Sequence, residues 1–214
     1  MNSELVKRII SSFILIPVSL YFIIKGSILF NFFLIIIFLV SVFEWFKMHN
    51  KIIVKILGLF FLILSFLSIL NIRNNIDDGL VYIFFILLIC ISTDIGGFTF
   101  GKYFKGPKFT SISPNKTYSG ILGSYVLTII FSGIFINYFE TYFSNKKIML
   151  IYFLVFLISS VSQMGDLIIS YFKRKSKIKD TGTIIPGHGG ILDRIDGMIF
   201  AFPFSYILFY LNLY

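Results

Sequence analysis

Residues 80–98 read LVYIFFILLICISTDIGGF, an apolar run whose one charged residue, Asp94, lies near its end. A run of about 20 apolar residues is the length that an α-helix needs to cross the hydrocarbon of a bilayer. Backbone N–H and C=O groups find no water there, which favours a helix because it pairs these groups internally. The stretch therefore predicts a transmembrane helix with a carboxylate close to one end.

Runs of this kind occur along most of the chain. Its 214 residues are 57% hydrophobic, and the apolar residues form long uninterrupted stretches that a water-soluble core does not require. The stretches also lack the two-residue alternation of transmembrane β-strands. We therefore predict an all-α, polytopic transmembrane helical bundle. Its seven expected spans lie near residues 9–24, 28–46, 52–70, 80–98, 121–139, 148–168 and 198–214.

The positive charges predict how the bundle is oriented. If residues 1–8 are cytoplasmic and the spans alternate, most of the 19 Lys and Arg residues lie on the cytoplasmic side. Those left on the other side are Lys25, Arg73, Lys146 and Lys147. The positive-inside rule then gives a cytoplasmic N-terminus and an external C-terminus. The net charge of +9 reflects orientation and contact with anionic headgroups, and we expect no nucleic-acid partner. The richness in Ile, Phe, Lys and Asn is typical of an AT-rich bacterial genome, so we expect a bacterial inner (plasma) membrane.

Two long polar loops, residues 99–120 and 169–197, fall on the predicted cytoplasmic face. Half of the ten acidic residues lie in or beside them, namely Asp94, Asp166, Asp180, Asp193 and Asp196. The others lie at span ends or in short connections, and we interpret them as solvated interface positions: Glu4, Glu44, Asp77, Asp78 and Glu140.

Asp94 and Asp166 each end an apolar run, and apolar sequence resumes after each of them. A carboxylate at that depth is costly, so it faces a polar cavity, an ion or a charged partner. For either residue alone, a helix end at the headgroup level is an equally good interpretation. Two such residues beside basic, glycine-rich loops on one face favour a shared site.

The second loop adds more charge in the stretch KDTGTIIPGHGGILDRIDG, residues 179–197. Asp193 and Asp196 are three apart, so they share one face if a helix begins there. Carboxylate oxygens suit Mg²⁺, which binds through one or two carboxylates together with substrate phosphates. Basic side chains that would neutralise those phosphates are Lys173, Arg174, Lys179 and Arg194. The alternative is a flexible, basic loop at the membrane surface.

Glycines surround His188, at positions 187, 189 and 190, where the backbone must turn tightly or approach a ligand closely. Neither His188 nor His49 has metal-ligand spacing to another His, which disfavours zinc, and we interpret His49 as interfacial. In the first loop, Ser113, Lys116 and Thr117 offer donors for phosphate or ribose, although a glycine-rich re-entrant turn is nearly as good an interpretation.

Taken together, these residues resemble the phosphatidate cytidylyltransferase family, also called CDP-diacylglycerol synthases. The resemblance covers residues 90–200. The matching positions are Asp94, Ser113-Pro114, Lys116-Thr117, Gly165-Asp166, Ser170, Lys173-Arg174, Lys179-Asp180, Gly182, Pro186-Gly187-His188-Gly189-Gly190 and Leu192-Asp193-Arg194-Ile195-Asp196. Members of the family commonly carry Trp-Glu-Gly where this chain has Tyr118-Ser119-Gly120, so we assign no role to residue 119. The N-terminal spans are also shorter than is usual in the family.

The resemblance implies an enzyme that joins CTP to phosphatidic acid, a membrane lipid, and releases pyrophosphate. It also implies Mg²⁺ with a second cation such as K⁺, a homodimer, N-terminal spans in residues 1–80, and a catalytic transmembrane domain in residues 81–214. The implied metal carboxylates are Asp166 and Asp193, supported by Asp196. The implied catalytic residues are Asp166, Asp193, Lys173, Arg174 and His188. The implied substrate-binding residues are Lys179, Asp180, Arg194, Gly189, Gly190, Ser113, Lys116, Thr117 and Asp94.

Other functions also account for parts of the pattern. A polyprenyl-phosphate sugar-phosphate transferase or a CTP-dependent lipid kinase would need cytoplasmic Asp residues and Mg²⁺ as well. A transporter would use Asp94 and Asp166 to carry cations or protons, but the chain shows no inverted halves. CDP-alcohol phosphatidyltransferases are disfavoured because their Asp-Gly-x-x-Ala-Arg arrangement is missing.

Overall fold

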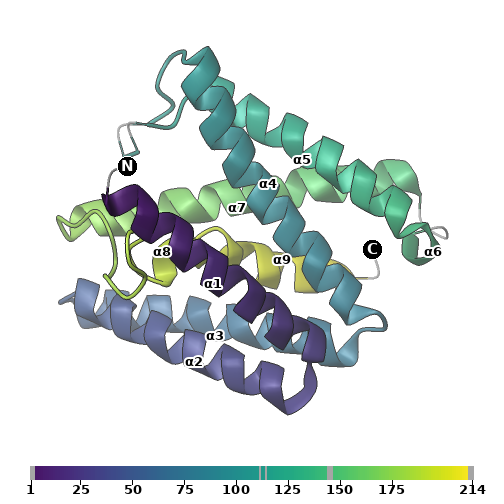
Figure 1. Ribbon diagram of the computed structural model, residues 1–214, viewed down its shortest axis with the longest axis horizontal. Coiled ribbons are helices and arrows are strands. Elements are labelled where there is room, and N and C mark those ends of the chain that lie inside the picture. The colour runs from purple at the N-terminus through teal and green to yellow at the C-terminus, as the bar shows by residue number, and fades with distance from the viewer. Residues whose placement is uncertain (1–2, 111, 114, 144–146, 212–214) are drawn as a thin grey trace.

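The computed structural model of the chain describes residues 3–110, 112–113, 115–143 and 147–211, and most of these residues are in helices (Figure 1). Pro114, Lys146 and residues 212–214, the end of the predicted seventh span, lie outside the described residues. The helices are α1 (Ser3–Lys25), α2 (Ser27–Met48), α3 (Ile52–Asn75), α4 (Gly79–Phe104), α5 (Tyr118–Tyr138), α6 (Glu140–Phe143), α7 (Ile148–Lys175), α8 (Leu192–Ile195) and α9 (Met198–Tyr210).

Among the described residues, six helices are long and apolar enough to cross a membrane, namely α1 to α5 and α7. Their outward faces carry large apolar side chains, such as Phe13 and Ile53, where a soluble protein carries charges. The predicted all-α, multi-span bundle is thereby confirmed. The seventh predicted span is shorter than expected, because α9 has 13 residues and packs between α3 and α7.

The polar loops are also shorter than predicted, because two helices continue past the apolar runs. Helix α4 extends to Phe104 and α7 extends to Lys175, so the loops begin at residues 105 and 176. At the end of α4, Gly101 packs against Thr117 and Gly120 at the start of α5. This close packing supports helical structure in a segment that the apolar pattern alone does not predict.

Figure 1 shows α7 and α9 between two helix pairs, α4–α5 on one side and α2–α3 on the other. The chain runs back and forth, so the end of the bundle at which α1 begins also holds the ends of α2, α4 and α7 (Figure 1). Helices α3 and α5 begin at this end, and so does α8. Both polar loops therefore lie at one end of the bundle.

Small residues hold α4 against α5. A Cβ atom on Gly96 would lie 2.5 Å from the carbonyl oxygen of Gly123 and 2.7 Å from the Cα atom of Ser124. Ser124 Oγ donates a hydrogen bond of 2.7 Å to the carbonyl oxygen of Thr93. Close approach of two backbones, with hydroxyl groups bonded across the contact, is how helices associate in lipid.

A layer of buried hydroxyl groups joins these two helices to α7. Thr93 Oγ1 lies 3.0 Å from Thr128 Oγ1 on α5 and 2.8 Å from Ser159 Oγ on α7. All three side chains are buried. Because each hydroxyl has a partner, the layer can lie inside the bundle without the cost of an unpaired polar group.

We predict that Gly96→Val destabilises the protein by about 1–3 kcal/mol, the usual cost of overpacking, because the new side chain meets the backbone of α5. Thermal unfolding of the detergent-solubilised protein measures the change. Gly133→Ala on α5 is the control, since its methyl group meets only the movable hydroxyl of Tyr152 at 2.8 Å. Equal unfolding temperatures for parent and Gly96→Val would contradict the proposed backbone contact.

Candidate active site

A cavity of about 340 Å³ opens at the end of the bundle where both polar loops lie. Its walls come from α4, α5 and α7, from the loop between α4 and α5, and from the segment around α8. Its charged lining residues are Asp94, Lys116, Asp166, Asp193, Arg194 and Asp196. Residues from four separate parts of the sequence therefore meet at one site, as the sequence analysis predicted for Asp94, Asp166 and the two loops.

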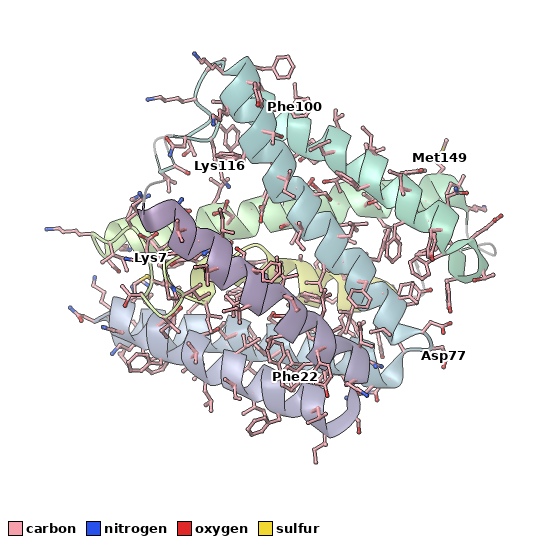
Figure 2. All side chains as sticks on the ribbon, viewed as in Figure 1. Lys7, Phe22, Asp77, Phe100, Lys116 and Met149 are labelled. Carbon is pink, nitrogen blue, oxygen red and sulfur yellow. The ribbon has the colours of Figure 1, made fainter. Side chains whose placement is uncertain are left out.

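Asp166, near the end of α7, pairs with a lysine of the first loop. Lys116 Nζ lies 2.6 Å from Asp166 Oδ2, and Ser170 Oγ donates a hydrogen bond of 3.2 Å to Asp166 Oδ1. Figure 2 shows Lys116 on the loop that connects α4 to α5, at the end of the bundle where α1 begins. The pair is partly open to solvent, so an incoming charged group can reach it.

Asp193 is buried and fully bonded at the start of α8. Lys173 Nζ donates to its Oδ1 atom at 3.0 Å, while the backbone N–H groups of Thr181 and Gly190 donate to its Oδ2 atom at 2.8 and 2.9 Å. Lys173 Nζ also lies 3.8 Å from Asp196 Oδ2. A buried ion pair is tolerated when its remaining atoms are hydrogen-bonded, as they are here.

Asp196 lies between α8 and α9, where its anionic form is disfavoured. Burial raises the pKa of Asp196 above the ordinary range, and the nearby Asp166 carboxylate raises it further. Among the described residues, Asp94, Asp166, Asp193 and Asp196 line the cavity together with Lys116 and Arg194. A cation bound among these carboxylates would favour the charged form of Asp196.

The donors of this cavity are of the right kind for Mg²⁺, because they are carboxylate oxygens. In the described part of the chain, however, no three His, Cys, Asp or Glu side chains are grouped as they would be around an ion. Lys116 and Lys173 instead place ammonium groups on Asp166 and Asp193. These contacts identify Asp166 and Asp193 as carboxylates that each bind a positively charged group.

Of the two remaining predicted residues of the first loop, Thr117 and Ser113, only Thr117 is among the described residues that line the cavity. Thr117 lines it, but its Oγ1 atom already accepts a hydrogen bond from Gly120 N and so caps α5. The carbonyl oxygen of Ser113 accepts a hydrogen bond from Lys116 N at 3.0 Å, which forms the turn that presents the lysine. Ser113 therefore contributes through its backbone to the position of Lys116.

Several predicted residues of the second loop do not line the cavity. Arg174, Lys179 and Asp180 are exposed, and the Arg174 guanidinium donates to the carbonyl oxygen of Ile178 beyond the end of α7. Gly189 has φ +92°, which suits glycine, and Gly190 supplies the N–H group that binds Asp193. The two glycines shape the turn that holds Asp193.

His188 faces α1 and is not among the lining residues. Its Nδ1 atom lies 2.8 Å from Ser11 Oγ and its Nε2 atom 3.3 Å from Ser12 Oγ. Burial lowers the pKa of His188, and Arg194 and Arg8 lower it further, so the neutral ring is favoured. Arg8 Nε also donates to the carbonyl oxygen of Gly187 at 2.8 Å. Helix α1 therefore holds the glycine-rich turn in place.

The sequence analysis was wrong about Glu44, which it interpreted as solvated. Glu44 is 2% exposed and accepts hydrogen bonds from Thr181 Oγ1, Ile191 N and Leu192 N. The signal was present, because Glu44 is a carboxylate near the end of an apolar run, as Asp94 and Asp166 are. His49 is also buried, packed against Trp45 and Phe172. Burial lowers the pKa of His49, with Lys175 and Lys55 adding to the effect.

Comparison with known proteins agrees with this site. The sequence pattern of the cytidylyltransferase family matches residues 49–212. Phosphatidate cytidylyltransferase of Rickettsia bellii is 36% identical over 223 aligned residues, covering 99% of this chain and 92% of that protein. The Rickettsia typhi enzyme of the same name is 34% identical, covering 97% of this chain and 91% of that protein. The Bacillus subtilis enzyme is 40% identical over 142 residues, or 65% of this chain and 51% of that protein.

The family match includes both polar loops and every charged residue that lines the cavity. It also covers more than half of the chain, and the Rickettsia enzymes align along nearly all of it. The resemblance seen in the sequence is therefore confirmed, and the chain belongs to the cytidylyltransferase family.

Proposed function

We propose that this chain transfers the cytidylyl group of CTP to phosphatidate, which gives CDP-diacylglycerol and pyrophosphate for phospholipid synthesis. The observation that carries the proposal is the cavity in which Asp94, Asp166, Asp193 and Asp196 meet Lys116 and Arg194. The names of the relatives support the choice of phosphatidate as acceptor.

The position of the cavity suits one lipid substrate and one soluble substrate. Phe98 and Ile121 line it beside the charged residues, and Phe98 is 69% exposed on the outer surface of α4. Acyl chains can remain against this apolar flank while the headgroup phosphate enters the cavity. The nucleotide approaches from the polar end, where the two loops lie.

The reaction brings two polyanions together. A phosphate oxygen of phosphatidate attacks the α-phosphorus of CTP, and the bond to pyrophosphate breaks. Phosphoryl transfer depends on positioning and on charge stabilisation more than on a covalent nucleophile. Lys116 and Arg194 are the lining cations that would bind phosphate oxygens. Lys173 holds Asp193, and the neutral His188 ring helps to fix the turn that carries Gly190.

We also propose that the site uses Mg²⁺, with a second cation such as K⁺. Asp166 and Asp193 would hold the divalent ion, with Asp196 in support. When bound, Mg²⁺ would neutralise phosphate charge and make the α-phosphorus more open to attack. Lys116, which pairs with Asp166 and lines the cavity, would then be free to bind substrate oxygens.

The chain is a multi-pass membrane protein, and we propose that it lies in a bacterial inner membrane with its N-terminus and active site in the cytoplasm. Support comes from the gathering of Lys and Arg at the end of the bundle that holds the cavity, which the positive-inside rule assigns to the cytoplasm. We further propose a homodimer, which the family resemblance implies.

The first prediction concerns Asp193. Membranes containing the chain should form CDP-diacylglycerol from CTP and phosphatidate in the presence of Mg²⁺, and chelation of the ion should abolish product. Asp193→Asn should lower kcat/KM by about 100-fold at an unchanged protein level, because the amide cannot replace the charge bound to Lys173. Glu140→Gln, a change to an exposed carboxylate of α6, is the control. Full activity of Asp193→Asn would contradict its role, and absence of product from the parent chain would contradict the function.

The second prediction concerns Lys116. Lys116→Met should raise the KM for CTP by about 10-fold, because a charge-assisted hydrogen bond to a phosphate is worth roughly 1.5–3 kcal/mol. Steady-state kinetics with varied CTP measures the effect. Lys108→Met is the matched control, since Lys108 belongs to the same loop but its side chain is exposed and outside the cavity lining. Equal KM values for the two variants would remove Lys116 from the nucleotide site.

The third prediction concerns orientation. A fluorescent reporter that folds only in the cytoplasm should stay dark when fused after Tyr214, whereas alkaline phosphatase fused there should be active. Both reporters should give the opposite result when fused after Lys105, in the loop between α4 and α5. Fluorescence from the C-terminal fusion would overturn the proposed topology.

A further inference from the structure

Glu44 is a buried carboxylate that the proposed reaction does not use. It lies near the end of α2, outside the segment that matches the family pattern, and it is not among the cavity-lining residues. In Figure 1, α2 lies on the opposite side of α7 and α9 from the α4–α5 pair. A buried acid that lies away from the site and belongs to an N-terminal helix needs an explanation of its own.

The hydrogen bonds of Glu44 all go to the loop that carries Asp193. Glu44 Oε2 accepts from Thr181 Oγ1 at 3.1 Å and from Leu192 N at 2.8 Å, and Oε1 accepts from Ile191 N at 3.0 Å. All three partners are donors, which fits a side chain whose two oxygens only accept. Glu44 thus holds residue 181 and residues 191–192, two ends of one loop segment.

Asp193 also accepts hydrogen bonds from both ends of this loop segment. Its Oδ2 atom accepts from Thr181 N at 2.8 Å and from Gly190 N at 2.9 Å. Thr181 therefore bridges the two carboxylates, with its hydroxyl on Glu44 and its N–H group on Asp193. A shift of the segment at Glu44 must move the N–H groups that orient Asp193.

Two loop glycines pack directly on Glu44. A Cβ atom on Gly182 would lie 2.7 Å from Glu44 Oε1, and one on Gly190 would lie 2.5 Å from Glu44 Oε2. Both positions match the family motif seen in the sequence, and the motif by itself gives no reason for glycine at either. Close approach to the Glu44 carboxylate supplies that reason.

We propose that Glu44 is a positioning residue, which sets the orientation of Asp193 by holding the segment of residues 181–192 at both ends. The proposal rests on the proposed function for its effect on the reaction, but the hold on the loop itself can be tested without any activity. Outer groups that orient metal-binding or catalytic carboxylates are commonly worth a 10- to 100-fold change in activity or metal affinity.

The loop is tested by limited trypsin digestion of the detergent-solubilised protein. Lys177 and Lys179 are exposed in the loop, so cleavage there reports how often the segment opens. Glu44→Gln should speed this cleavage about 10-fold. The amide N–H₂ group of Gln cannot accept the hydrogen bond that one carboxylate oxygen accepts from the loop, so the loop is held less firmly. Ser41→Ala is the matched control, because Ser41 is equally buried on α2 but its Oγ atom binds only Ile37 O of its own helix.

The reaction is tested with the same variants in the membrane assay. Glu44→Gln should lower kcat 10- to 100-fold and raise the Mg²⁺ concentration needed for half-maximal activity, with little change in the KM for CTP. Glu44→Asp, which keeps both acceptor oxygens, should recover part of the loss. Thr181→Val, which removes one of the three donors, should give a smaller loss than Glu44→Gln.

The outcomes separate the two ideas. Unchanged cleavage in Glu44→Gln would show that Glu44 does not hold the loop. Faster cleavage of Glu44→Gln with parental kcat and Mg²⁺ dependence would show that Glu44 holds the loop without positioning the site. The same conclusion would follow if the activity of Glu44→Gln fell only in proportion to the amount of folded protein. If the parent chain itself makes no CDP-diacylglycerol, the proposed function fails, while the digestion still decides the role of Glu44.

Discussion

Charge compensation at the edge of the hydrocarbon is the constraint on which this structure depends. Asp193 and Glu44 are buried among apolar helices, and each would destabilise the fold if its oxygens had no partners. Lys173 and two backbone N–H groups of the loop meet this need for Asp193. Three donors of the same loop meet it for Glu44. The hydrogen bonds to Asp193 and Glu44 therefore hold the loop after α7 in place, and the same bonds stabilise the two buried carboxylates.

The same requirement links the site to its chemistry. Asp166 on α7 pairs with Lys116 in the loop between α4 and α5, and Asp94, Asp193 and Asp196 line the same cavity. Membership in the cytidylyltransferase family fits a cavity that combines carboxylates with basic side chains.

The sequence predicted the parts of this arrangement that have a local signature. Uninterrupted apolar runs gave the membrane helices, and carboxylates at the ends of those runs gave Asp94 and Asp166. The ordered motif after α7 gave Asp193 and Asp196. Glu44 also ends an apolar run, but its partners could not be read from the sequence, because two of them are backbone N–H groups and all three lie far along the chain. The continuation of α4 past its apolar run was not predicted for a similar reason, since it depends on contact with α5.

The hydroxyl layer of Thr93, Thr128 and Ser159 has a consequence for the membrane as a whole. Thr93 and Ser124 form part of the cavity wall, and fully buried apolar side chains follow within one or two turns of Thr93 and Ser159, at Ile86, Ile89 and Val155. An ion that entered the cavity would meet hydroxyls that are already bonded to one another, and then hydrocarbon. A polar site can thus lie among membrane helices while the bilayer keeps its electrical insulation.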